Sequence, residues 1–421
     1  MTVRTEYLMI APEPVHTETI RYATAGRFER PRPVTADDPA SGQLCPQLSS
    51  RLDAVMGRPH DRPPQGEDCL NLSIATPARD HRARPVMVWL HGGGFNSGGG
   101  LMQWYDGSRL SADGDVVVVS VNYRLSIFGF LHLDGISTGN LGILDQLEAL
   151  RWVHAHIGEY GGDPDNVTLF GQSAGGVSAR LLMEVPEARG LFHRVIMQSA
   201  PLSISKQDPE IAARAAEIFA DHLGSDPRTA DPADILRAVH ATAAEWKNVA
   251  AYSFEPPFGP TGGVGPLDAS DDRLGELATD LDVLYGWNAD DLTAFAPQGR
   301  DIEPMMEEIF AAPWRALNQR LVRAGAHTQS YRLDWRPDGS AFGATHCLEL
   351  PLLLGPENAW RGSPMLGGTL WNEVEAFGTA LRRAWISFAR TGTPDYEATA
   401  SWPITWRRET DSALRPVRLA P

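Results

Sequence analysis

The sequence predicts an α/β fold in which helices flank a mixed, mostly parallel central sheet. Residues 86–90 and 116–121 are apolar runs bounded by turn residues, which is typical of strands buried on both faces of such a sheet. Residues 141–157 carry apolar side chains at spacings of three and four, which predicts an amphipathic helix. Buried strands and a covering helix therefore alternate along this part of the chain.

The remaining elements follow in chain order. The stretch up to about residue 68 is rich in Pro, Asp and Arg, which predicts a loop-rich lead-in with a few short strands. The helix at 141–157 should end at the turn residues 161–164. Further buried strands are predicted at 167–170, 195–197 and 283–285, and an alternating strand-like stretch begins at 327.

We expect one domain spanning residues 1–421, with a helical insertion. A length of 421 residues and 43% hydrophobic content are sufficient to bury a large core. Residues 201–281 are Ala-rich and charged, which predicts helices forming a reduced cap or lid over the sheet. The chain is therefore interpreted as one sheet domain with a cap rather than as two domains.

Charge and cysteine content exclude several classes of function. The 53 acidic and 37 basic side chains give a net charge of -16, which repels a nucleic-acid backbone. No apolar run reaches about 18 residues, so no membrane partner is expected. The three cysteines form no C-x-x-C pair, so neither a metal nor another cofactor is implied. The first residues lack the features of a secretion signal, and we predict a cytoplasmic protein.

The strongest chemical motif is the run Gly-Gln-Ser-Ala-Gly-Gly at residues 171–176. Glycine-rich turns with a serine are common, and the pattern alone is as consistent with a plain turn as with a site. Here it follows a predicted strand and precedes a predicted helix, and in that setting G-x-S-x-G forms a nucleophile elbow. Ser173 is therefore the candidate nucleophile.

A second glycine motif, His-Gly-Gly-Gly-Phe at residues 91–95, follows another buried strand. Consecutive glycines leave backbone N–H groups accessible, and acyl transfer needs such donors where the carbonyl oxygen becomes negative. A flexible loop is the simpler interpretation. A phosphate-binding loop is disfavoured because no Gly-Lys-Ser or Gly-Lys-Thr follows.

A serine nucleophile needs a histidine base and an orienting carboxylate. In the last third of the chain, His327 opens a strand-like stretch and is best explained as structural. His346 lies in a loop-like segment and is the stronger candidate base. Asp290 and Asp291 both follow the predicted strand at 283–285, where the acid should lie, and position alone does not choose between them.

Together these segments resemble the type B carboxylesterase family, which includes cholinesterases and bacterial nitrobenzyl-ester hydrolases. The matching segments, in family order, are residues 67–72, 91–95, 122–125, 161–164, 171–176, 198–200, 288–291, 346–349, 385–389 and 402–403. The resemblance implies an α/β-hydrolase fold, with Ser173 as nucleophile and His346 as base. It also implies an oxyanion hole made by the N–H groups of Gly93, Gly94 and Ala174.

Three departures from the family pattern bear on the site. The family acid is usually Glu, whereas this chain carries the shorter Asp291 at that position, reaching His346 either through a closer backbone or through water. The usual Glu before the nucleophile is Gln172, a substrate-pocket residue in this interpretation, so a choline ester is an unlikely substrate. The chain is also shorter than typical members. Cys45 and Cys69 occupy positions that resemble the family's first disulfide, and we expect them to be reduced.

The leading hypothesis is a serine hydrolase that cleaves carboxylic esters through an acyl-enzyme intermediate. Its expected partners are small-molecule esters, uncharged and of short to medium chain length. One alternative is an acyl-transferring or biosynthetic enzyme that uses the same Ser-His-acid site. A non-catalytic binding protein is disfavoured because Ser173 and His346 are both present. The sequence makes no prediction of oligomeric state.

Overall fold

A computed structural model describes residues 15–34, 38–252, 254–270, 273–296 and 299–408. In these ranges the main sheet has nine strands. Across the sheet they are β1 (His16–Arg21), β4 (Asn71–Thr76), β6 (Val117–Val121), β5 (Arg84–Leu90), β9 (Gly162–Gln172), β10 (Arg194–Gln198), β11 (Asp282–Asn288), β12 (His327–Leu333) and β13 (Ile404–Arg408).

The sheet is mixed and mostly parallel, as predicted. The six strands from β6 to β12 run parallel, and β1, β4 and β13 pair antiparallel at the two edges. The carboxyl ends of β5, β9 and β11 therefore open on the same edge of the sheet, where ligands bind in open α/β sheets. The three motifs singled out in the sequence each follow one of these ends.

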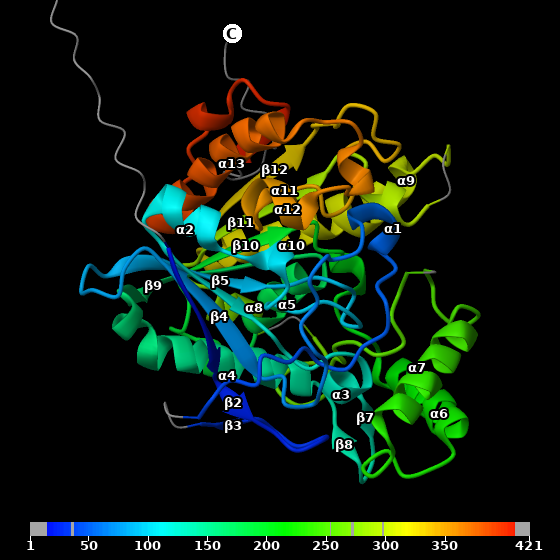
Figure 1. The fold of residues 1–421 in the computed structure, drawn as a ribbon. Helices are drawn as coiled ribbons and strands as arrows, with labels where there is room; N and C mark the ends of the chain where they lie inside the picture. The colour runs from blue at the N-terminus through cyan, green and yellow to red at the C-terminus, as the bar shows by residue number, and fades with distance from the viewer. Residues whose placement is uncertain (1–14, 35–37, 253, 271–272, 297–298, 409–421) are drawn as a thin grey trace, which may run out of the picture.

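Helices cover both faces of the sheet (Figure 1). Side chains of β5 alternate between two cores, with Val86, Val88 and Leu90 in one and Met87 and Trp89 in the other. On the first face lie α4 (Leu141–His156), α5 (Ala174–Leu182) and α10 (Ala312–Ala324), and on the second lie α2 (Ser108–Gly114) and α13 (Trp371–Thr391). Burial on both faces explains why the central strands are apolar runs without alternation.

Shorter elements connect this framework. The short strands are β2 (Ala23–Thr24), β3 (Arg32–Pro33), β7 (His132–Leu133) and β8 (Ser137–Thr138). The short helices are α1 (Asp53–Met56), α3 (Ser126–Phe130), α8 (Leu274–Leu277), α9 (Glu303–Met306), α11 (Leu350–Leu353) and α12 (Glu357–Trp360).

The predicted elements are present, with shifted boundaries. The helix predicted at 141–157 ends at His156 and continues as a 3-10 turn to Tyr160, where Gly161 adopts a φ of 77°. The strand predicted at 167–170 begins earlier, at Gly162, because that residue pairs with Arg84 of β5. Because the first residues of this strand are polar, a hydrophobicity pattern does not detect the extension.

Residues 201–281 contain two amphipathic helices, α6 (Pro209–Leu223) and α7 (Pro232–Trp246), which pack against each other. Each begins at an aspartate that caps the helix, Asp208 and Asp231, followed by proline at the first helical position. The aspartate accepts a hydrogen bond from a backbone N–H that has no partner within the helix, and the proline fixes φ at a helical value in the first turn. Between α7 and α8 the described chain runs as loops and turns.

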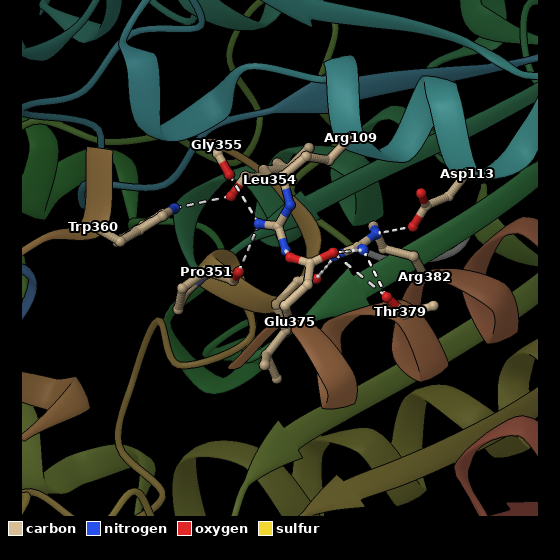
Figure 2. Close-up of polar contacts among 10 residues, drawn as sticks. Arg109, Asp113, Pro351, Leu354, Gly355, Trp360, Glu375, Thr379 and Arg382 are labelled. Atoms are coloured by element: carbon tan, nitrogen blue, oxygen red, sulfur yellow. Dashed lines mark hydrogen bonds and ion pairs between the residues drawn. The ribbon is translucent and has the colours of Figure 1, made fainter. Parts of the chain in front are cut away.

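A partly buried ionic network joins α2, α11 and α13 (Figure 2). Arg382 of α13 donates to Asp113 and Glu375, each at 2.6 Å, and to the carbonyl oxygen of Leu352 at 2.8 Å. Arg109 of α2 also contacts Glu375, and it donates to the carbonyl oxygens of Pro351 and Gly355 at 3.0 and 2.8 Å. Because α11 closely follows His346, the network fixes the segment that carries this candidate base.

None of the helices in the described ranges combines the length and apolar character needed to cross a membrane.

Candidate active site

Ser173 lies on the sharp turn between β9 and α5. Its backbone adopts φ 56° and ψ −123°, a region that residues other than glycine rarely occupy, and its N–H donates to the carbonyl oxygen of Gln198 at 2.8 Å. Gly175 makes the turn possible, because a Cβ there would lie 1.9 Å from the carbonyl oxygen of Leu90. The strained turn leaves Ser173 8% exposed at the helix N-terminus.

His346 and Asp291 come together from two loops. Asp291 begins the turn after β11, and its carboxylate contacts Nδ1 of His346 directly. The other carboxylate oxygen of Asp291 accepts from the backbone N–H of Asn288 at 2.8 Å, and its carbonyl oxygen accepts from the N–H of His346 at 3.2 Å. The shorter side chain therefore reaches the histidine because the backbones lie close, without a bridging group.

Asp290 has a different environment. Its carboxylate binds the guanidinium of Arg336 through two hydrogen bonds of 2.7 and 2.9 Å and accepts from the N–H of Ala344 at 2.8 Å. It thus ties the turn after β11 to the loop that precedes His346. Of the two candidate acids, Asp291 is the one that lies against Nδ1 of His346.

The glycine loop after β5 has a conformation that requires glycine. Gly93 adopts a φ of 110°, and a Cβ there would lie 2.0 Å from the carbonyl oxygen of Ser97. The carbonyl oxygen of Gly93 accepts from the N–H groups of Asn96 and Ser97 at 3.1 and 3.2 Å, which fixes the loop. Ala174 is the first residue of α5, so its N–H has no acceptor within the helix.

These residues share the wall of one cavity of about 550 Å³. Ser173, His346, Gly93, Gly94 and Ala174 all line it, and Asp291 lies behind His346, fully buried. The remaining wall is largely apolar and includes Leu236, Val239, Trp246, Phe254, Leu292, Phe295 and Phe310. The arrangement brings a candidate nucleophile, a candidate base held by a carboxylate, and the glycine loop together beside an apolar pocket.

Gln172 lies beside the base and off the main cavity wall. It is 1% exposed, and it lines a separate pocket of about 20 Å³ with Cys347. Its amide nitrogen lies 3.0 Å from Nε2 of His346. Since Nδ1 donates its proton to Asp291, Nε2 carries the lone pair and accepts from the amide. The side chain that the sequence analysis places in the substrate pocket therefore contacts the candidate base, His346.

Glu349 is a buried neighbour of the site to which the sequence analysis assigned no role. Its carboxylate accepts from Ser199 Oγ at 3.1 Å, Asn288 Nδ2 at 2.7 Å and the Tyr331 hydroxyl at 3.3 Å. Burial, together with the nearby Asp291 carboxylate, raises the pKa of Glu349 to about 7. The signal available in the sequence was its position three residues after His346.

Metal-ligating clusters and cysteine thiols are the remaining chemical features of the described chain. Within the described ranges, no group of three or more His, Cys, Asp or Glu side chains is arranged to hold a metal ion. Cys45, Cys69 and Cys347 are buried free thiols. A hydrogen bond with Cys45, together with burial, raises the pKa of the Cys69 thiol well above its ordinary value, so this thiol is protonated at neutral pH.

The chain is similar to proteins named as esterases and hydrolases over about nine tenths of its length. The model of the carboxylesterase family matches residues 16–322. A protein of Rhodococcus erythropolis named "Probable N-octanoylanthranilate hydrolase" is 39% identical over 91% of this chain and 90% of its own. The para-nitrobenzyl esterase of Bacillus subtilis is 34% identical over 92% of this chain and 87% of its own.

Solved structures agree with these matches. A PNB esterase structure superposes with a TM-score of 0.79 at 32% sequence identity, covering 91% of this chain and 88% of the other. With a mixed sheet flanked by helices on both faces, this likeness identifies the α/β-hydrolase fold. The chain therefore belongs to the carboxylesterase family and is a carboxylic ester hydrolase.

Proposed function

We propose that ester cleavage by this protein proceeds through an acyl-enzyme on Ser173. The observation that carries the proposal is the shared cavity wall of Ser173, His346, Gly93, Gly94 and Ala174. In the proposed reaction, Ser173 Oγ attacks the ester carbonyl while His346 Nε2 takes its proton. The N–H groups of the two glycines and Ala174 stabilise the oxyanion, and such donors are each worth about 10²-fold or more in rate.

In this proposal Asp291 holds the tautomer of His346. Its carboxylate accepts the Nδ1 proton, so Nε2 is available as a base, and its negative charge stabilises the imidazolium that forms. The histidine then returns the proton to the leaving alcohol, and water releases the acyl group by the same steps in reverse. Both side chains are buried, which strengthens their electrostatic interaction relative to water.

Gln172 has a positioning role in the same proposal. Its amide donates to Nε2 of His346 in the free protein, and Ser173 must replace it at this lone pair before attack. The amide holds the imidazole in place without the negative charge that a glutamate would bring. A positively charged choline ester gains no electrostatic attraction from this side chain.

We further propose that the apolar cavity accepts the acyl chain of an ester of short to medium length. Helix α7, within the proposed cap at 201–281, contributes Leu236, Val239 and Trp246 to the wall. The name of the Rhodococcus relative specifies an octanoyl group, and an acyl chain of that kind suits an apolar cavity of about 550 Å³.

A fluorophosphonate probe tests the nucleophile. We expect one covalent adduct, mapped to Ser173 by mass spectrometry, and none after Ser173→Ala or in heat-denatured protein. Labelling that persists at the same level in folded Ser173→Ala would contradict the assignment.

Hydrolysis and acyl transfer are distinguished by a competition assay. Adding a primary alcohol to a para-nitrophenyl ester reaction shows whether the acyl-enzyme passes to water or to the alcohol. Hydrolysed acid as the main product at physiological alcohol concentrations supports the hydrolase, and a dominant transesterified product supports the transferase alternative.

A further inference from the structure

A buried hydroxyl on the cavity wall has no hydrogen-bond partner. Ser126, the first residue of α3, lines the cavity together with Ser173, Gly93 and Gly94. It is 2% exposed, and within the described part of the chain its Oγ makes no hydrogen bond. Leaving a buried hydroxyl unpartnered costs free energy, and a polar ligand atom that pairs with it removes that cost.

The backbone fixes Ser126 next to the glycine loop. Its N–H donates to the carbonyl oxygen of Phe95 at 2.6 Å, and Phe95 directly follows Gly94 in the chain. Ser126 has a φ of 49°, in the left-handed region that glycine adopts at lower cost than residues with a Cβ. The chain therefore carries a hydroxyl at a position where the backbone alone favours glycine.

A second unpartnered donor on the same wall indicates what kind of atom would bind. Trp246 of α7 lines the cavity, and its indole Nε1 is buried without a hydrogen-bond partner in the described ranges. An indole N–H can only donate, and a serine hydroxyl can donate as well. The rest of the wall is largely apolar. A neutral oxygen that accepts a hydrogen bond therefore complements these groups better than a purely hydrocarbon chain.

We propose that Ser126 is a specificity-determining residue that donates a hydrogen bond to a neutral oxygen atom of the substrate. The substrate class is then esters with an ether, carbonyl or hydroxyl oxygen a few bonds from the scissile carbonyl, in the acyl chain or in the alcohol. The inference rests on the proposed reaction at Ser173 and deepens it, because in that reaction the neighbouring glycine loop holds the reacting carbonyl group.

An oxygen scan of the substrate tests this role and locates the acceptor. The reference is para-nitrophenyl heptanoate, and its isosteric analogues replace one methylene of the acyl chain by oxygen. These are the para-nitrophenyl esters of butoxyacetate, 3-propoxypropanoate, 4-ethoxybutanoate and 5-methoxypentanoate. The alcohol side is probed by 2-methoxyethyl heptanoate against butyl heptanoate.

The measured quantity is the ratio of kcat/KM for the oxygen-bearing ester to kcat/KM for its hydrocarbon counterpart. It is divided by the same ratio for hydroxide-catalysed hydrolysis, which removes the inductive effect of the oxygen on the reactivity of the ester. In the wild-type protein we expect this corrected ratio to peak at one oxygen position.

Ser126→Ala removes the hydroxyl and keeps the Cβ, whereas Ser126→Gly removes both and suits the φ of 49°. We expect both variants to lower the corrected ratio by about 3- to 10-fold at the peak position, as is typical of one neutral hydrogen bond. Ser111→Ala is the matched control, because Ser111 of α2 also has a buried hydroxyl without a partner in the described ranges and lies outside the cavity wall. It should leave every ratio as in the wild-type protein.

The outcomes separate this inference from the proposed function. Corrected ratios that are equal in the wild-type protein and both Ser126 variants at every position overturn the inference and leave ester hydrolysis at Ser173 intact. A wild-type scan without a peak overturns it too, and that result needs no folded variant. An equal fall in Ser111→Ala also counts against the inference, because it would show lost packing rather than a lost contact in the cavity. A wild-type protein that hydrolyses none of these esters contradicts the proposed function itself.

Discussion

Replacing Asp291 with Asn gives the most direct test of how the candidate acid acts. One carboxylate oxygen of Asp291 accepts from the backbone N–H of Asn288 at 2.8 Å, and the other contacts Nδ1 of His346. In Asp291→Asn, the amide oxygen must remain on the Asn288 N–H, because two donors cannot face each other. The amide nitrogen then points to Nδ1, which must accept, and the proton of the imidazole moves to Nε2.

This tautomer is the wrong one for catalysis, because Nε2 no longer carries a lone pair for the proton of Ser173. We expect kcat to fall by about 10³- to 10⁴-fold, as in triads that suffer the same change, equivalent to roughly 4 to 5.5 kcal/mol of activation free energy. The shape of the side chain is kept, so KM should change little. Burst and steady-state kinetics with a para-nitrophenyl ester measure both constants, and circular dichroism verifies the fold.

Asp290→Asn is the matched control. Asp290 binds the half-exposed Arg336, and an ion pair of this kind contributes about 1 kcal/mol or less to stability. We expect this variant to keep most of its turnover. Asp291→Glu should also lose activity, since the present carboxylate already contacts the buried imidazole and no room remains for another methylene. Near-native turnover in folded Asp291→Asn, with loss in Asp290→Asn, would refute the reasoning.

Three further predictions concern stability. Because the pKa of Glu349 is raised from 4.5 to about 7 in the folded state, its stabilising contribution is complete below pH 4.5 and is lost as the pH rises to about 7. Over that pH interval, urea unfolding should show that the free energy of unfolding of the wild-type protein falls by about 3 kcal/mol relative to that of Glu349→Gln. If the free energies of unfolding of the two proteins change in parallel with pH, the prediction is contradicted. Arg382→Met should cost about 1.5 to 3 kcal/mol in unfolding free energy, because it removes the charge-assisted hydrogen bonds of a buried guanidinium to the part-exposed carboxylates of Asp113 and Glu375. Arg383→Met, at a side chain that is 64% exposed, should cost about 1 kcal/mol or less. Gly175→Ala should prevent the elbow from packing and give insoluble protein. Gly158→Ala is the control and should express normally, because an added methyl group there meets no atom within 4 Å. Equal yields of soluble protein for the two variants would count against a steric requirement at the elbow.

The sequence by itself determined the class of fold, and it predicted the elbow and the candidate base. Apolar runs without alternation predicted strands buried on both faces, and the structure shows a mostly parallel sheet with helices on either side. The elbow could be predicted from a short motif because its steric constraint involves only neighbouring residues. A strand-to-helix turn with the φ of Ser173 tolerates only small neighbours, and that requirement is visible in five consecutive residues. His346 could be chosen over His327 because only one of them follows a strand in a loop.

Only the tertiary structure decided which acid faces the histidine and what surrounds it. Asp290 and Asp291 are adjacent in the chain, and they diverge because the turn after β11 directs one carboxylate to Arg336 and the other to His346. Gln172 contacts His346, and Arg51 lies near Gly94 although more than forty residues separate the two in sequence. Such contacts depend on loop geometry and on side-chain direction across separate elements, and hydrophobic periodicity carries no information about either.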